Sequence, residues 1–264
     1  YEQLMAAAFT NSSYRHPIIG WMDDLKNMTY EDALEWYQDW YAPNNAVLVV
    51  SGDVMPDDVK ALAEKYYGPI PAKKIKERKP QIEVSQIGTK RIVVKAPAEN
   101  PEITFAWKVP KIEPSDLNAM DPYALSVLAA ILDGHANSRL NRQMVRDQRL
   151  ADSVDASYGM SGRGPQLFSI SASPAKGKSL TAIEENIRKI LADIKTKGVS
   201  DTELDRVKSQ LVSSQIYKRD SIFAQAMEIA MAEMNGISWK YLDDMVLNVQ
   251  KVQSKDIQRV VEKY

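Results

Sequence analysis

Two alternating runs near the middle of the chain constrain its fold most strongly. Val154 and Ala156 alternate with polar residues, and the pattern returns at Phe168 and Ile170, which serines flank. A period of two is typical of a β-strand with one buried and one wet face. The glycine-rich residues 159–164 lie between the two runs and precede no helix, which favours a hairpin turn over a phosphate loop. The sequence therefore predicts an antiparallel strand pair.

Helical patterns and further strands surround this pair. Asp121 and Pro122 are residue types preferred at the first positions of a helix, and Gly134 is typical of a helix end. The sequence therefore predicts a helix between them. A capping box over residues 200–203 starts another helix. More strands are expected at residues 91–95 and 103–109, and more helices at residues 137–149 and from 178 onward. This mixture of antiparallel strands and segregated helices predicts an α+β fold.

The first 70 residues predict helix, helix, strand and helix. Thr29 and Asp32 have the form of a capping box, and the helix that follows runs to Trp40. The continuous apolar run Ala46–Val50 predicts a buried strand. Core and interdomain packing, rather than base stacking, is predicted for the aromatic residues of this segment: Tyr14, Trp21, Tyr30, Trp36, Tyr37, Trp40 and Tyr41. Core packing, rather than an adaptable binding face, is predicted for a methionine stripe near the C-terminus: Met227, Met231 and Met234.

The basic stretch between Pro71 and Lys90 suggests a domain boundary. It crowds five lysine and arginine side chains between prolines, with no aromatic residue among them, which favours a solvated linker over an anion-binding surface. We expect residues 1–72 to be the C-terminal part of a first domain, 73–90 a linker, and 91–264 a second domain.

Composition excludes several functions. The formal net charge of -1 gives no electrostatic footprint for nucleic acid, and no apolar run is long enough to span a membrane. The absence of cysteine excludes disulfides, thiolate nucleophiles and Cys-ligated zinc.

An internal repeat relates two helix starts. Residues 28–32, which open the helix to Trp40, resemble residues 252–256, which open the helix to Tyr264. The first copy continues through Tyr41–Asn45 into a strand. The repeat therefore predicts that a strand belongs after the second copy as well.

Several motifs together resemble the pitrilysin/insulinase-type metallopeptidases. The similarity extends over essentially the whole chain. It is carried by His16–Gly20, Asp24–Leu25, Met28–Asp32, Trp40–Asn45, Leu48–Asp53, Leu132–Gly134 and Ser138–Leu140.

The resemblance implies two homologous α/β sandwich domains, the first only partly present and the second lacking its last strand. Such proteins form clamshell halves that enclose an unfolded peptide. Their zinc is held by an inverted His-x-x-Glu-His motif and a downstream glutamate, leaving one position open for water.

This chain departs from the zinc pattern. It contains no His-x-x-Glu-His, and its only histidines, His16 and His135, fall in different predicted domains. In the family pattern the third zinc ligand, the downstream glutamate, lies before the segment that matches Tyr1, so Glu2 cannot be that ligand. We therefore expect no catalytic, cofactor-binding or metal-binding residue in this chain, and expect the zinc motif upstream of Tyr1.

The resemblance also implies an arginine and a tyrosine that hold the substrate carbonyl in a partner half. The matching stretch, Val145–Val154, offers Arg146 or Arg149, but Asp152 stands where the tyrosine is expected. A carboxylate would repel a developing oxyanion. The chain therefore resembles the zinc-bearing half, with its Arg/Tyr partner supplied by a homologous subunit or a second copy.

The function implied is that of a subunit of a zinc-dependent, periplasmic endopeptidase that processes peptides, inactive as this chain alone. A cytoplasmic location is the alternative to the periplasm. The alternative function is an inactive homologue that serves as a structural subunit of a processing complex. A His-x-x-Glu-His motif upstream would decide between the two functions.

Overall fold

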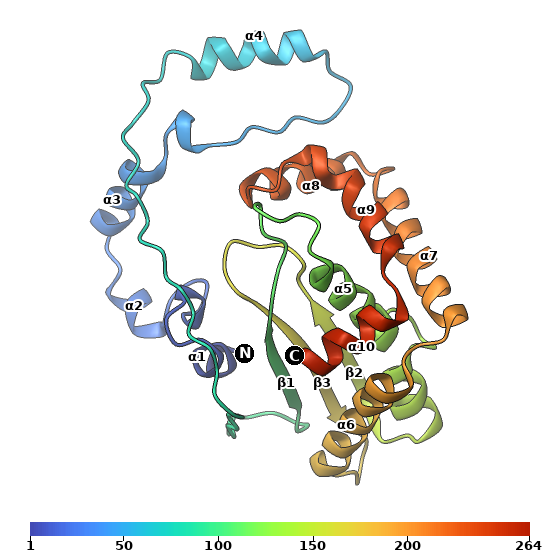
Figure 1. Ribbon diagram of the computed structural model, residues 1–264. Coiled ribbons are helices and arrows are strands. Elements are labelled where there is room, and N and C mark those ends of the chain that lie inside the picture. The colour runs from blue at the N-terminus through green and yellow to red at the C-terminus, as the bar shows by residue number, and fades with distance from the viewer. The chain divides into compact units, whose positions relative to one another are not determined.

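The computed structural model describes residues 1–264, which divide into two compact units. Unit 1 comprises Tyr1–Ile92 and Lys218–Trp239, and unit 2 comprises Val93–Tyr217 and Lys240–Tyr264. All three strands of the structure lie in unit 2 (Figure 1). The predicted α+β class is confirmed, whereas the predicted domain bounds stay a prediction.

Unit 1 consists of short helices joined by extended chain. Its elements are α1 (Glu2–Ala8), η1 (Ser13–Arg15), α2 (Met22–Asn27), α3 (Tyr30–Trp40), η2 (Pro43–Asn45), α4 (Pro56–Tyr67) and α8 (Ile222–Met234).

The capping box at the start of α3 is confirmed. The Thr29 hydroxyl accepts a hydrogen bond from the Asp32 amide at 3.3 Å, and the Asp32 carboxylate accepts one from the Thr29 amide at 2.8 Å. These reciprocal bonds satisfy two backbone donors that a helix start leaves open.

Two strand predictions are wrong, and both have the same cause. Ala46–Val50 and Arg91–Lys95 form no strand and are largely exposed. A strand requires a hydrogen-bonded neighbour, and neither segment has one. Several aromatic and methionine side chains are also more exposed than core packing requires, while the interdomain packing predicted for the aromatic residues stays a prediction. Side chains expected to be buried are at least 40% exposed at Tyr30, Trp36, Tyr37, Tyr41, Met227, Met231 and Met234.

The basic stretch after Pro71 contacts α3. The Lys76 ammonium lies 2.5 Å from the Asp39 carboxylate, and the Arg78 guanidinium lies over the Trp40 ring at 4.5 Å from its centre. The Asn44 side chain and the Lys73 backbone exchange two hydrogen bonds. The stretch is exposed, as predicted, but these contacts fix part of its course.

Unit 2 is a three-stranded antiparallel sheet with helices packed against it. Its elements are β1 (Ile103–Val109), α5 (Met120–Asp133), η3 (Asn141–Asp147), β2 (Ala151–Tyr158), β3 (Gln166–Pro174), α6 (Leu180–Lys197), α7 (Asp201–Lys218), α9 (Leu242–Lys251) and α10 (Ser254–Lys263). The strand order is β1-β3-β2, and the η4 turn (Trp239–Tyr241) precedes α9.

The predicted hairpin of β2 and β3 is confirmed. Phe168, Ile170 and Ala172 of β3 are 4%, 0% and 2% exposed, while the serines between them lie on the other face. Isoleucines of α6 at helical spacing cover this sheet with fully or nearly fully buried side chains: Ile183, Ile187, Ile190 and Ile194. α5 ends at Gly134, as predicted, although it begins at Met120 rather than at Pro122.

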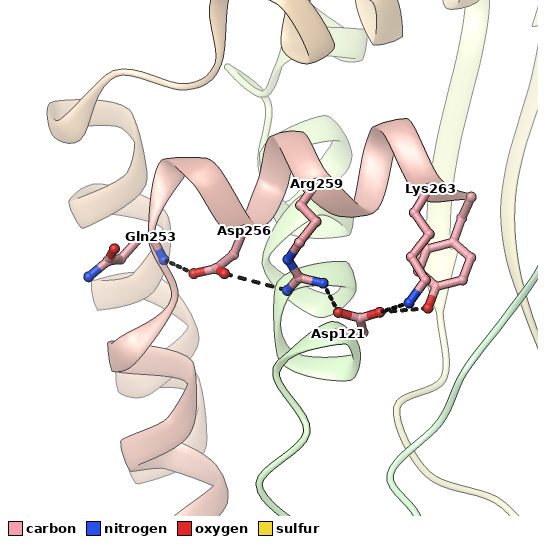
Figure 2. A network of polar contacts seen from close by, with 6 residues as sticks. Asp121, Gln253, Asp256, Arg259 and Lys263 are labelled. Carbon is pink, nitrogen blue, oxygen red and sulfur yellow. Dashed lines mark hydrogen bonds and ion pairs between the residues drawn. The ribbon is translucent and has the colours of Figure 1, made fainter.

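Asp121 fastens α10 to the start of α5 (Figure 2). Its carboxylate accepts hydrogen bonds from Lys263 at 2.9 Å and from the Tyr264 hydroxyl at 2.6 Å, and it also binds Arg259. Partial burial pushes the pKa of Asp121 upward, but the three donors outweigh this and lower the pKa to about 2.

The start of α10 is joined to the turn between α6 and α7. The Ser254 hydroxyl donates to the Val199 carbonyl at 2.8 Å and accepts from the Val199 amide at 3.0 Å. Gly198 beside it has φ of 71°, and a Cβ there would lie 2.9 Å from the Ser254 oxygen. Glycine at this position permits both the left-handed backbone and the close approach of α10.

A buried polar cluster joins α9 to the segment before α5. The Tyr241 hydroxyl accepts a hydrogen bond from the Asn248 amide at 2.6 Å and lies 3.2 Å from the Tyr123 hydroxyl. The Tyr123 hydroxyl also donates to the Leu117 carbonyl at 2.8 Å. Burial raises the pKa of Tyr123, so the phenol stays protonated and able to donate.

Candidate functional site

The segment matched to a substrate-holding arginine and tyrosine runs from η3 into β2. The predicted helix over residues 137–149 is present mainly as the seven-residue π-helix η3. π-helical turns are rare and often occur at functional sites. Arg146 lies near the end of η3 and donates a hydrogen bond to the Asn137 side chain. Arg149 follows with a left-handed φ of 48° and an exposed side chain.

Asp152 lies at a β-bulge near the start of β2. Ala151 pairs with Pro174 and Ser153 pairs with Ser173, so Asp152 is the additional residue on its strand. Bulges alter the direction in which side chains project. Asp152 is exposed, and its side chain makes no hydrogen bond or ion pair. The structure therefore joins neither Arg146 nor Arg149 to Asp152.

A polar hollow of about 480 Å³ lies beside η3, between the segment that precedes it and the α6–α7 turn. The carboxylates that line it are paired: Glu203 with Arg139, and Asp193 with Lys197 at 2.7 Å. The side chains of Arg142 and Arg206 also line the hollow and have no polar partner. The hollow thus presents unpaired guanidinium groups and no set of donors that suits a divalent cation.

Glu203 shows what sequence reasoning missed here. Its backbone amide donates to the Ser200 hydroxyl at 3.3 Å, which is one half of the predicted capping box. The other half does not form, because the Glu203 carboxylate instead binds Arg139. The sequence carries no local signal for this pair, because Arg139 and Glu203 are 64 positions apart.

Asp133, at the end of α5, is the other partly buried carboxylate near this region. It accepts a hydrogen bond from the Ala156 amide on the outer edge of β2 at 3.2 Å, and it also binds the Asn141 side chain. Burial, together with the nearby Asp155 carboxylate, raises the pKa of Asp133. Its contacts hold η3 and β2 beside the end of α5.

The two histidines occupy separate environments. The His16 Nδ1 atom accepts a hydrogen bond from the Trp21 indole at 3.1 Å, within unit 1. The His135 Nδ1 atom accepts one from the Asn137 amide at 3.0 Å, within unit 2. Nowhere in residues 1–264 do three or more His, Cys, Asp or Glu side chains gather closely enough to hold a metal ion. No helix of the structure is long and apolar enough to cross a membrane.

Residues 27–211 match the family model described as the peptidase M16 inactive domain. This match covers more than half of the chain. The chain belongs to the peptidase M16 family. The predicted resemblance to pitrilysin/insulinase-type metallopeptidases is thereby confirmed.

The chain is also similar to individual proteins and solved structures. The chain is 24% identical over 269 residues to the uncharacterized zinc protease YmxG of Bacillus subtilis, covering 100% of this chain and 63% of that protein. The structure is similar to that of a protease from Helicobacter pylori, with a TM-score of 0.89 at 24% identity over 97% of this chain and 61% of that one. It is also similar to a chain of Complex III2 from Candida albicans, with a TM-score of 0.79 at 18% identity over 99% of this chain and 62% of that one.

The lengths of these similar proteins limit what can be said of function. The chain spans less than two thirds of the length of YmxG and of the Helicobacter pylori protease. The zinc and the protease activity in the relatives' names therefore refer to those longer proteins in full.

Proposed function

We propose that this chain forms the non-catalytic part of a zinc-dependent endopeptidase subunit. In this role it supplies chamber wall and partner contacts, while the zinc ligands lie on other residues of the complete enzyme. The observation that carries the proposal is the match of residues 27–211 to the M16 inactive domain, in a chain without a metal-binding group of side chains.

The substrate of the complete enzyme would be a peptide, and its second half would be a homologous subunit or a second copy. Support comes from the stretch around η3. Arg146 can donate hydrogen bonds there, but a carboxylate such as that of the exposed Asp152 can only accept them. A partner half that carries both an arginine and a tyrosine would supply the missing donor to a developing oxyanion. The periplasmic location stays a prediction.

A combined zinc and cleavage assay tests the proposal. We would measure bound zinc by plasma mass spectrometry and cleavage of a fluorogenic peptide, for this chain and for the longer natural protein that contains it. The longer protein should bind about one zinc, as a three-ligand catalytic site requires, and cleave the peptide, whereas this chain should do neither.

A matched control distinguishes cleavage at the zinc site from cleavage by a contaminating protease. The longer protein with the glutamate of its His-x-x-Glu-His motif replaced by glutamine should keep zinc and lose cleavage, because that residue is the expected general base. A longer protein that binds no zinc would overturn the proposal.

The second candidate function is that of a structural subunit without activity. The fold similarity to a chain of Complex III2 from Candida albicans, with a TM-score of 0.79, supports it, because that chain is part of a complex. The same assay distinguishes the two functions. A longer protein that lacks zinc and cleavage but purifies in a stable complex with another subunit would favour the structural role.

A further inference from the structure

The polar hollow beside η3 carries a surplus of positive charge. Four basic and two acidic side chains line it, which leaves an excess of two positive charges. The whole chain has a formal net charge of -1, so this excess is a local property of the hollow. A concave surface lined by one sign of charge concentrates the electric field and attracts ligands of the opposite sign.

Both acidic side chains of the hollow are already occupied. The two carboxylate oxygens of Glu203 each accept a hydrogen bond from Arg139, at 2.9 and 2.7 Å. The Asp193 carboxylate accepts one from Lys197 at 2.7 Å. This bond, together with the nearby charges of Lys197, Lys189 and Arg139, holds the pKa of Asp193 below its usual value. Both carboxylates therefore stay ionised and paired with these cations.

Arg142 and Arg206 supply the surplus charge, and they reach the hollow from two different elements. Arg142 belongs to the π-helical turn η3, and Arg206 belongs to the second turn of α7. π-helical turns are rare and often occur at functional sites. The hollow therefore receives one unpaired guanidinium group from each of two walls.

The walls of the hollow are fixed relative to each other. The fork between Arg139 and Glu203 joins the segment before η3 to α7, and Arg139 also donates to the Gly198 carbonyl at 3.3 Å. Ile190, which lines the hollow, is 2% exposed and anchored in the core. A site held in place before its ligand arrives loses less entropy on binding. The volume of about 480 Å³ is that of a typical small-molecule site.

We propose that this hollow binds a small phosphate-bearing molecule, whose phosphate group lies between the guanidinium groups of Arg142 and Arg206. A guanidinium group donates paired hydrogen bonds to phosphate oxygens. The oxygens of a tetrahedral phosphate point in several directions, so they can accept from two walls at once. A planar carboxylate presents its two oxygens in one plane and suits this arrangement less well. The inference does not depend on the proposed role in a peptidase.

A titration followed by nuclear magnetic resonance tests the proposal. The ¹⁵N-labelled chain is titrated at low ionic strength with glycerol 2-phosphate, a phosphate monoester that is doubly charged at about pH 8. Succinate, which carries the same charge on two carboxylates, is titrated in parallel. We expect saturable shifts at the backbone amides of residues 137–147 and 190–206, with tighter binding of the phosphate ester.

Matched variants distinguish a site from general attraction between charges. Arg142→Gln and Arg206→Gln should each weaken binding of the phosphate ester by about tenfold, because charge-assisted hydrogen bonds are lost. Arg142→Lys keeps the charge but loses the paired donors, so it should also bind more weakly. Lys176→Gln removes one charge from an exposed side chain that does not line the hollow, and it should leave the affinity nearly unchanged. Circular dichroism verifies that the variants fold.

Three results would overturn the proposal. One is the absence of saturable binding. Another is equal weakening by Arg142→Gln and Lys176→Gln, which would mean that the ester responds only to the overall charge. The third is succinate binding as tightly as the phosphate ester, because the hollow would then not select a phosphate group. The titration involves neither zinc nor peptide, so its failure would leave the proposed function unaffected.

Discussion

Arg139 donates two hydrogen bonds to the carboxylate of Glu203, from Nε to Oε1 at 2.9 Å and from Nη2 to Oε2 at 2.7 Å. The side chains are 16% and 19% exposed, so neither charge is well solvated. This fork joins the segment before η3 to the first turn of α7. Two-point arginine–carboxylate pairs are strong, because both hydrogen bonds are charge-assisted and their geometry is fixed.

Removing one partner of this pair should destabilise unit 2. Arg139→Met leaves the Glu203 carboxylate partly buried without its donor, and we expect a loss of about 2 to 4 kcal/mol in the free energy of unfolding by urea. The double variant Arg139→Met/Glu203→Met should lose less than either single variant. As a control, Lys197→Met breaks an exposed pair with Asp193 and should cost less than about 1 kcal/mol. A double variant less stable than both single variants would contradict this account.

The Asp121 cluster predicts a particular acid dependence. Because the folded-state pKa is lowered from 3.8 to about 2, the stability that Asp121 contributes is present above about pH 4 and is lost as the pH falls through 2. Asp121→Asn should cost about 1 to 3 kcal/mol at pH 7, reduced by the partial exposure of its partners. Urea denaturation measured from pH 7 to pH 2 should show the free energies of unfolding of the wild type and the variant becoming equal near pH 2. If the two free energies of unfolding differed by a constant amount over this pH range, Asp121 would not be the source of the acid dependence.

Removing the Tyr241 hydroxyl should lower the stability of unit 2. In Tyr241→Phe, the buried Asn248 amide loses its 2.6 Å acceptor, and an unsatisfied buried donor costs about 1 to 3 kcal/mol. Thermal unfolding followed by circular dichroism measures the change. Tyr217→Phe is the control, because Tyr217 is 72% exposed and should lose almost nothing. Equal effects of the two variants would mean that the hydroxyl contributes nothing through Asn248.

The isoleucine stripe of α6 should dominate the core. Ile187 is fully buried, so Ile187→Ala should destabilise the chain by about 2 to 5 kcal/mol through lost burial and the cavity that remains. Ile216 on α7 is 57% exposed, and Ile216→Ala should cost less than about 1 kcal/mol. Similar losses for both would show that α6 relaxes to fill the cavity.

The sequence predicted correctly those helices and strands that are specified by residues close together in the chain. The alternation at Phe168 and Ile170 gave β3, the Thr29–Asp32 box gave the start of α3, and Gly134 gave the end of α5. In each of these, the decisive contacts lie within a few residues of one another or follow from a repeating face.

Two predictions that depended on distant partners failed, although the strand predicted at residues 103–109 did form, as β1 paired with β3. Ala46–Val50 has strand composition but no strand beside it, and the sequence pattern cannot show whether a neighbour exists. Glu203 lies where a capping box requires it, yet Arg139 takes its carboxylate because a charge-assisted fork is stronger than a helix cap. The π-helical turn of η3 likewise has no simple periodic signature.

The way α10 is held has a consequence for synthesis on the ribosome. Asp121 meets Tyr264 across 143 positions, and Ser254 meets Val199 across 55. The hairpin of β2 and β3 can form early, because its strands are neighbours in sequence, but the cover over α5 and α6 cannot close until α10 has emerged. During translation, the apolar surface of unit 2 therefore stays uncovered until nearly the whole unit has been made, an interval in which chaperones would be expected to bind it.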